Sequence, residues 1–122
     1  MENFHALFVD DDKGFLDSIK TIFDIEGIKV YCVESGEDAL NAIKEKNFNI
    51  MITDLTMNGM SGLDLTRKAK ELLPGLPIVL LTGNFISSEF SALAVKMGVS
   101  KIFVKPVNLN AILDMVRGET KR

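Results

Sequence analysis

The sequence has 122 residues, of which 47% are hydrophobic and 25% are charged. This length and composition predict one globular domain and exclude a disordered chain. A net charge of −3 disfavours a nucleic-acid-binding surface, and Cys32, the single cysteine, excludes a framework of internal disulfides.

We interpret residues 1–122 as one domain, with an ordered core over about 4–117 and a polar tail over 118–122. No apolar stretch approaches the roughly 20 residues that cross a bilayer, and the N-terminus lacks the pattern of a signal peptide. We therefore expect a cytoplasmic domain without direct membrane or nucleic-acid partners. Cys32 lies in an apolar run and is expected to be an inert thiol of the core.

Short apolar runs alternate five times with segments of helical periodicity, which is the pattern of βαβ units around a parallel sheet. Several of these runs are almost continuously apolar, as expected for strands that are covered on both faces. The predicted strands are residues 5–9, 28–33, 49–53, 77–81 and 101–104. The sequence therefore predicts an α/β fold.

The predicted helices are bounded by capping residues and glycines. Ser35 and Ser61 are predicted to cap the second and third helices, and Gly27 is predicted to end the first. We expect the fourth helix to begin at Phe85 and the fifth to fray after Val116, where the sequence becomes polar. The inward stripe predicted for the fourth helix comprises Ile86, Phe90, Leu93, Ala94 and Met97.

Polar residues stand at the carboxyl ends of four predicted strands. Asp10 and Asp11 follow the first strand and Asp54 follows the third, whereas Thr82 and Lys105 follow the fourth and fifth. Ligands of open parallel sheets bind outside these strand ends. Each residue alone carries little information, but their joint placement predicts one shared site.

This residue set fits phosphoryl transfer to a carboxylate in the presence of a divalent metal. Adjacent carboxylates repel one another and lose hydration near a sheet, and a cation with oxygen ligands such as Mg²⁺ relieves both costs. We expect Asp11 to bind the metal directly, Asp10 directly or through water, and Asp54 as a third carboxylate. Asp54 is also the predicted nucleophile, with the Lys105 cation and the Thr82 hydroxyl stabilising the phosphoryl charge. Mn²⁺ could substitute for Mg²⁺.

The sequence resembles the receiver domain of bacterial two-component response regulators over nearly its whole length. No single motif is diagnostic, but five occur in order with family-like spacing. They are Asp10-Asp11, the acceptor segment Ile52-Thr53-Asp54-Leu55-Thr56-Met57-Asn58-Gly59-Met60-Ser61-Gly62, the Leu81-Thr82-Gly83 step, Met97-Gly98 and Lys105-Pro106.

The resemblance implies a flavodoxin-like fold, a doubly wound (βα)5 sandwich of three layers with strand order 2-1-3-4-5. It implies that Asp54 accepts a phosphoryl group from a phosphohistidine on a sensor kinase or phosphotransfer protein. Mg²⁺ would be held by Asp11, Asp54 and the main-chain carbonyl of Thr56, with Asp10 assisting. The Lys105–Pro106 peptide bond would be cis.

The resemblance also implies a signalling domain that catalyses only its own phosphorylation and dephosphorylation. Its activation would be a population shift in which the Thr82 hydroxyl moves toward the phosphate. The fourth helix, fifth strand and fifth helix would then repack to bind or release a downstream protein. Thr56 and Asn84 stand where the family tunes phosphate lifetime, and neither is a carboxylate, which predicts slow self-dephosphorylation.

Two departures from the family pattern concern the switch and the loop after the acceptor. The family usually has Tyr or Phe at the position of Ile102, and the neighbouring Phe103 should face the other side of its strand. The switch is therefore expected to depend on Thr82 and loop movement. Asn58 stands where many members have proline, which predicts a more mobile loop.

Two alternatives remain open. The first is a receiver-like interaction module that no longer accepts phosphate, which Ile102 favours and the intact acids disfavour. The second is a haloacid-dehalogenase-type phosphatase, whose nucleophile belongs to an Asp-x-Asp motif on the first strand. Here Asp54-Leu55-Thr56 lacks the second aspartate, and the order of nucleophile and acidic pair is reversed. Glycine-rich nucleotide-binding loops are absent from the sequence.

Overall fold

Five parallel strands form one sheet in the order β2-β1-β3-β4-β5, which confirms the predicted topology. The computed structural model describes residues 4–83 and 85–120. The strands are β1 (His5–Val9), β2 (Lys29–Val33), β3 (Ile50–Asp54), β4 (Ile78–Thr82) and β5 (Val99–Val104). The helices are α1 (Lys13–Ile25), α2 (Gly36–Glu45), α3 (Gly62–Leu72), α4 (Ser88–Lys96) and α5 (Leu109–Thr120).

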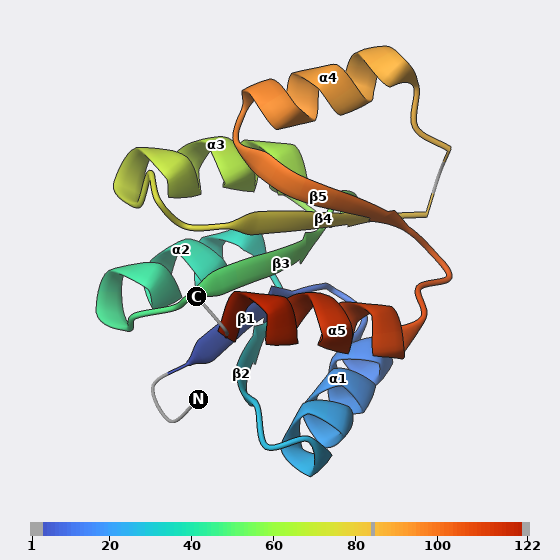
Figure 1. The fold of residues 1–122 in the computed structure, drawn as a ribbon. Helices are drawn as coiled ribbons and strands as arrows, with labels where there is room; N and C mark the ends of the chain where they lie inside the picture. Colours follow the sequence, from blue (N-terminus) through green and yellow to red (C-terminus); the bar gives the residue numbers. More distant parts are fainter. Residues whose placement is uncertain (1–3, 84, 121–122) are drawn as a thin grey trace.

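The sheet lies between two layers of helices, with α1 and α5 on one face and α2, α3 and α4 on the other (Figure 1). Alternation along the strands explains why both faces are apolar. In β1, Ala6 and Phe8 pack toward α1 and α5, whereas Leu7 and Val9 pack toward α2 and α3. None of the described helices has the length and hydropathy of a membrane-spanning segment.

Side-chain oxygens accept main-chain N–H groups at the starts of the helices, and at α5 Asn108 accepts the Asn110 N–H. Asp12, Ser35, Ser61 and Ser87 each accept a hydrogen bond from a main-chain N–H in the first turn of α1, α2, α3 and α4, respectively. These bonds satisfy donors that have no partner within the helix. The caps at Ser35 and Ser61 confirm the predicted helix starts.

The fourth helix begins later than predicted. Ser87 caps α4, so Phe85 and Ile86 lie in the preceding loop and outside the helix. Phe85 is 94% exposed, and Leu93, predicted to face inward, is 48% exposed. Only Ala94 is fully buried on this helix, which packs against β4 and β5.

The fifth strand and fifth helix also differ from the predicted bounds. β5 begins at Val99, two residues before the predicted start. A register shift pairs Ile78 with Val99 but Val79 with Lys101, so Val99 still belongs to the strand. α5 continues beyond Val116 to Thr120. Arg117 pairs with Asp114 within α5 and with Glu26 after α1, which gives the polar end of the helix partners.

Candidate functional site

Asp10 and Asp11 follow β1 directly and have very different environments. Asp10 is fully buried, and its Oδ1 accepts the Asp12 N–H at 2.9 Å. Burial raises the pKa of the Asp10 carboxyl, while the Asp12 N–H and the Lys105 ammonium oppose that rise. Asp11 is exposed, and its Oδ2 accepts the main-chain N–H of Asn58 at 3.1 Å.

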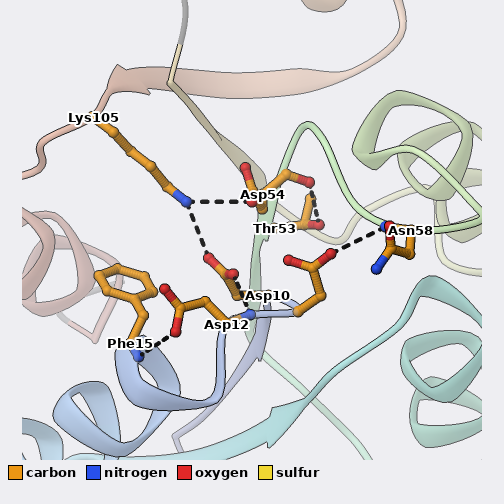
Figure 2. Close-up of polar contacts among 8 residues, drawn as sticks. Asp10, Asp12, Phe15, Thr53, Asp54, Asn58 and Lys105 are labelled. Carbon is orange, nitrogen blue, oxygen red and sulfur yellow. Dashed lines mark hydrogen bonds and ion pairs between the residues drawn. The ribbon is translucent and has the colours of Figure 1, made fainter.

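Asp54 is the last residue of β3 and is 7% exposed. Two hydrogen bonds hold the peptide unit that joins Asp54 to Leu55. The Thr53 hydroxyl donates to the Asp54 carbonyl at 3.0 Å, and the Leu55 N–H donates to the Leu81 carbonyl at 2.7 Å. The carboxylate therefore points out of a strand end whose position is fixed by the sheet (Figure 2).

Lys105 joins the two buried carboxylates. Its Nζ lies 3.2 Å from Oδ2 of Asp10 and 3.3 Å from Oδ2 of Asp54 (Figure 2). Burial by itself favours the neutral amine, but the two carboxylates outweigh it and raise the pKa of Lys105. The same Nζ lies 5.3 Å from the centre of the Phe15 ring. Lys105 is thus a positioned cation at neutral pH, and the Lys105–Pro106 peptide bond is cis.

Thr82 ends β4 and is almost completely buried. Its carbonyl accepts the Lys105 N–H at 2.6 Å, which ties the end of β4 to the end of β5. The residue borders a surface hollow of about 340 Å³ beside α4. The other lining residues are Leu55, Phe85, Ile86, Ser87 and Phe90.

Three carboxylates offer a ligand set that fits a divalent cation. One oxygen each from Asp10, Asp11 and Asp54 lies within 4.8 Å of the others. Oxygens bound to one Mg²⁺ are at most roughly 4.2 Å apart, twice the Mg–O distance, so small side-chain movements would suffice. The donor set is all oxygen and carries several negative charges, which suits Mg²⁺ or Mn²⁺.

Comparison with known proteins identifies the family. The model of the response regulator receiver domain matches residues 6–117. The chain belongs to this family. The receiver domain is 31% identical over 112 residues to the transcriptional regulatory protein GlrR of Escherichia coli (strain K12), covering 92% of this chain and 25% of that protein. It is 30% identical over 113 residues to the response regulator protein TodT of Pseudomonas putida, covering 93% of this chain and 49% of TodT.

Solved receiver structures have the same fold. The receiver domain of the Francisella response regulator 1452 superposes with a TM-score of 0.90 at 27% identity, covering 98% of both chains. A CheY-like receiver domain protein from Methanospirillum hungatei JF-1 gives 0.84 at 32% identity, covering 97% of both. The receiver domain spans about a quarter to a half of the length of the two curated relatives above.

The receiver domain gathers most of the predicted site residues at one edge of the sheet. Oxygens of Asp10, Asp11 and Asp54 lie within 4.8 Å of one another, and Lys105 pairs with Asp10 and Asp54. Thr82 ends β4, the strand between β3 and β5. Thr56 is exposed in the loop after β3, Ile102 is half-buried beside α4, and Asn84 lies outside the described residues.

Two residues of this site have no signal in the sequence. Phe15 faces the Lys105 ammonium, but its position on an apolar helix stripe predicts only core packing. Asn58 contributes a main-chain N–H, which every residue except proline carries. The prediction for Phe103 is confirmed, because it packs with the α1 and α5 layer while Ile102 packs toward α4.

Proposed function

We propose that this receiver domain accepts a phosphoryl group on Asp54 from a phosphohistidine of a sensor kinase or phosphotransfer protein. The observation that carries the proposal is the pairing of Asp54 with Lys105 at 3.3 Å beside the oxygens of Asp10 and Asp11. A carboxylate nucleophile, a fixed cation and further acidic ligands are the groups that phosphoryl transfer to a side chain requires.

In the proposed reaction an Asp54 oxygen attacks phosphorus while the phosphorus–nitrogen bond to histidine breaks. The electron pair of that bond remains on the imidazole nitrogen, and the product is an aspartyl phosphate. The transition state is loose, so the protein contributes mainly position and charge. Lys105, whose pKa is raised, is placed to pair with the phosphoryl oxygens. We propose that Thr82 adds a hydroxyl donor.

We propose that Asp11, Asp54 and the Thr56 carbonyl hold Mg²⁺, with Asp10 binding directly or through water. When bound, the ion would neutralise charge on the acids and on the transferring group. Asp10 is fully buried, and Lys105 is its cationic partner. We propose that this pairing keeps the Asp10 carboxylate charged and therefore able to bind the ion.

Intact-mass spectrometry after incubation with acetyl phosphate and MgCl₂ tests the proposal. We expect one added phosphoryl group, and none when EDTA replaces the metal. Asp54→Ala should abolish the addition, whereas Asp24→Ala, which removes an exposed acid on α1, should leave it unchanged. Addition to the Asp54→Ala variant would assign the acceptor to another residue.

We further propose that phosphorylation alters the surface formed by α4, β5 and α5, through which a downstream protein is bound or released. Exposed apolar side chains on α4, its leading loop and β5 support this: Phe85, Leu93, Val95 and Val104. Thr82 and Ile102, which lie beneath α4, are the proposed switch residues. Amide chemical shifts in α4 and β5 should therefore change when acetyl phosphate is added.

The second candidate function is an interaction module with the receiver fold that is not phosphorylated. The aliphatic Ile102 at the switch position favours it. Wild-type protein that gains no mass from acetyl phosphate or from a panel of phosphorylated kinases would establish this alternative. Turnover of small phosphate esters would instead support the phosphatase alternative.

A further inference from the structure

Asp11 is held by a bond from the loop that follows the acceptor strand. The main-chain N–H of Asn58 donates to Oδ2 of Asp11 at 3.1 Å, across 47 residues of sequence (Figure 2). Asp10 and Asp54 are oriented by burial and by Lys105, but Asp11 is exposed. An exposed carboxylate otherwise rotates freely. The Asn58 bond therefore restricts Asp11, the proposed carboxylate ligand that burial does not orient.

The loop that carries this donor is anchored on both sides. Before it, Met57 is buried against the α2 and α3 layer. After it, Met60 packs so closely on Gly36 at the start of α2 that a Cβ there would lie 2.8 Å from Met60 Sδ. Gly62 then closes the loop by donating its N–H to the Leu55 carbonyl at 2.8 Å. The donor therefore has a defined position before any ligand binds.

A carboxylate can accept such a bond and still bind a cation. Its two oxygens offer about four acceptor sites, of which the Asn58 N–H uses one. Carboxylates that bind metals are commonly held by a further hydrogen bond, and loss of that partner lowers metal affinity by about 10- to 100-fold. We infer that the main-chain N–H of Asn58 is a positioning group for divalent-metal binding, acting through Asp11.

This inference rests on the proposed metal site and adds a residue to it. It also connects metal binding to the loop between β3 and α3, because the same bond fixes Asp11 and holds the loop. The Asn58 side chain is exposed and takes no part in this bond, so the inference concerns the backbone donor alone.

Two substitutions at position 58 separate the donor from the side chain. Asn58→Ala keeps the N–H, whereas Asn58→Pro removes it. Titration of the full chain with MgCl₂ by calorimetry should show affinities for wild type and Asn58→Ala that agree within about twofold, and an affinity about tenfold lower for Asn58→Pro. Equal affinities for the alanine and proline variants would overturn the inference and leave the metal site intact. Wild type that does not bind Mg²⁺ would overturn both.

Proline also restricts the backbone, so a second measurement leaves the loop sequence unchanged. Amide hydrogen exchange is followed by NMR in EDTA, for wild type and Asp11→Ala. The Asn58 amide should exchange about tenfold faster in the variant, since its acceptor is lost. The Leu55 amide, bonded to the Leu81 carbonyl, is the internal control and should not change. An Asn58 amide that exchanges equally fast in both proteins refutes the bond on which the inference depends.

Discussion

The Lys105 ammonium lies 3.3 Å from Oδ2 of Asp54, so the cation and the proposed nucleophile are paired before any ligand binds. The same ammonium lies 3.2 Å from Oδ2 of Asp10 and thereby links the ends of β1 and β3. Residues at the ends of β1, β3 and β5 are thus connected through the Lys105 ammonium. This arrangement has consequences for both stability and metal binding.

We predict that Lys105→Met destabilises the protein and strengthens Mg²⁺ binding. Removing one partner of a buried ion pair costs about 3–5 kcal/mol, and we expect about 1–3 kcal/mol here because the Lys105 side chain is 30% exposed. The remaining carboxylates repel one another more strongly, so a cation gains affinity. Urea unfolding in EDTA and magnesium calorimetry measure the two effects. Lys44→Met, at an exposed position of α2, is the control and should change neither.

Gly62 limits the space behind the acceptor residue, and we predict that Gly62→Ala is destabilising. A Cβ at this position would lie 2.3 Å from the Asp54 carbonyl oxygen and 2.9 Å from the Leu55 Cα. Backbone must move to accommodate it, and overpacking of this kind typically costs about 1–3 kcal/mol. Urea unfolding measures the loss. Gly75→Ala is the matched control, because nothing lies within 4 Å of a Cβ there.

The strand ends show why the sequence predicts which side chains gather at one edge of the sheet. Apolar runs terminate at Asp10, Asp54 and Thr82, and a parallel sheet brings such ends to one edge whatever the details of packing. The start of β5 was harder to predict, because the polar residues Ser100 and Lys101 interrupt the apolar pattern after Val99. The register shift against β4 absorbs the extra residue.

Main-chain chemistry set the limit of prediction. The start of α4 depends on Ser87 accepting the Phe90 N–H, whereas the apolar pair Phe85 and Ile86 suggested an earlier start. The Asn58 bond to Asp11 likewise depends on where a loop places one N–H. Neither feature produces a periodic pattern in the sequence, because both depend on local hydrogen bonds.

We predict that phosphate on Asp54 is lost slowly from the purified protein. Thr56 follows the acceptor by two residues, is exposed and has no carboxylate to take a proton from attacking water. Without a base at this position, hydrolysis of the aspartyl phosphate lacks the acceleration that a general base would give. Intact mass recorded at intervals after removal of acetyl phosphate gives the lifetime in Mg²⁺. Loss of the label within seconds would contradict the prediction.

Cys32 should react slowly with alkylating reagents in the folded state. Burial raises the pKa of the Cys32 thiol from 9.0 to about 11, so the reactive thiolate is about 100-fold scarcer at mildly alkaline pH. Iodoacetamide labelling followed by mass spectrometry measures the rate. Denaturing urea, which exposes the thiol, is expected to restore ordinary reactivity. Equal rates with and without urea would show that burial does not protect it.

His5 should make the protein less stable as the pH falls. Its ring packs against Phe48 with centroids 4.7 Å apart, and Lys29 and Lys46 lie nearby. Burial, followed by these two cations, lowers the pKa of His5 below its usual 6.5. The unfolded chain therefore binds more protons between the lowered value and 6.5, and stability falls as the pH drops through that window.

The variant His5→Gln isolates this effect, because it removes the titrating group from the start of β1. Urea midpoints of both proteins are compared at about pH 7.5 and about pH 5, and wild type should lose more stability than the variant between them. Carboxylates elsewhere titrate in both proteins and cancel in the comparison. An equal loss would mean that the pKa of His5 is not lowered in the folded state, so that neither burial beside Phe48 nor the two lysines acts on the ring.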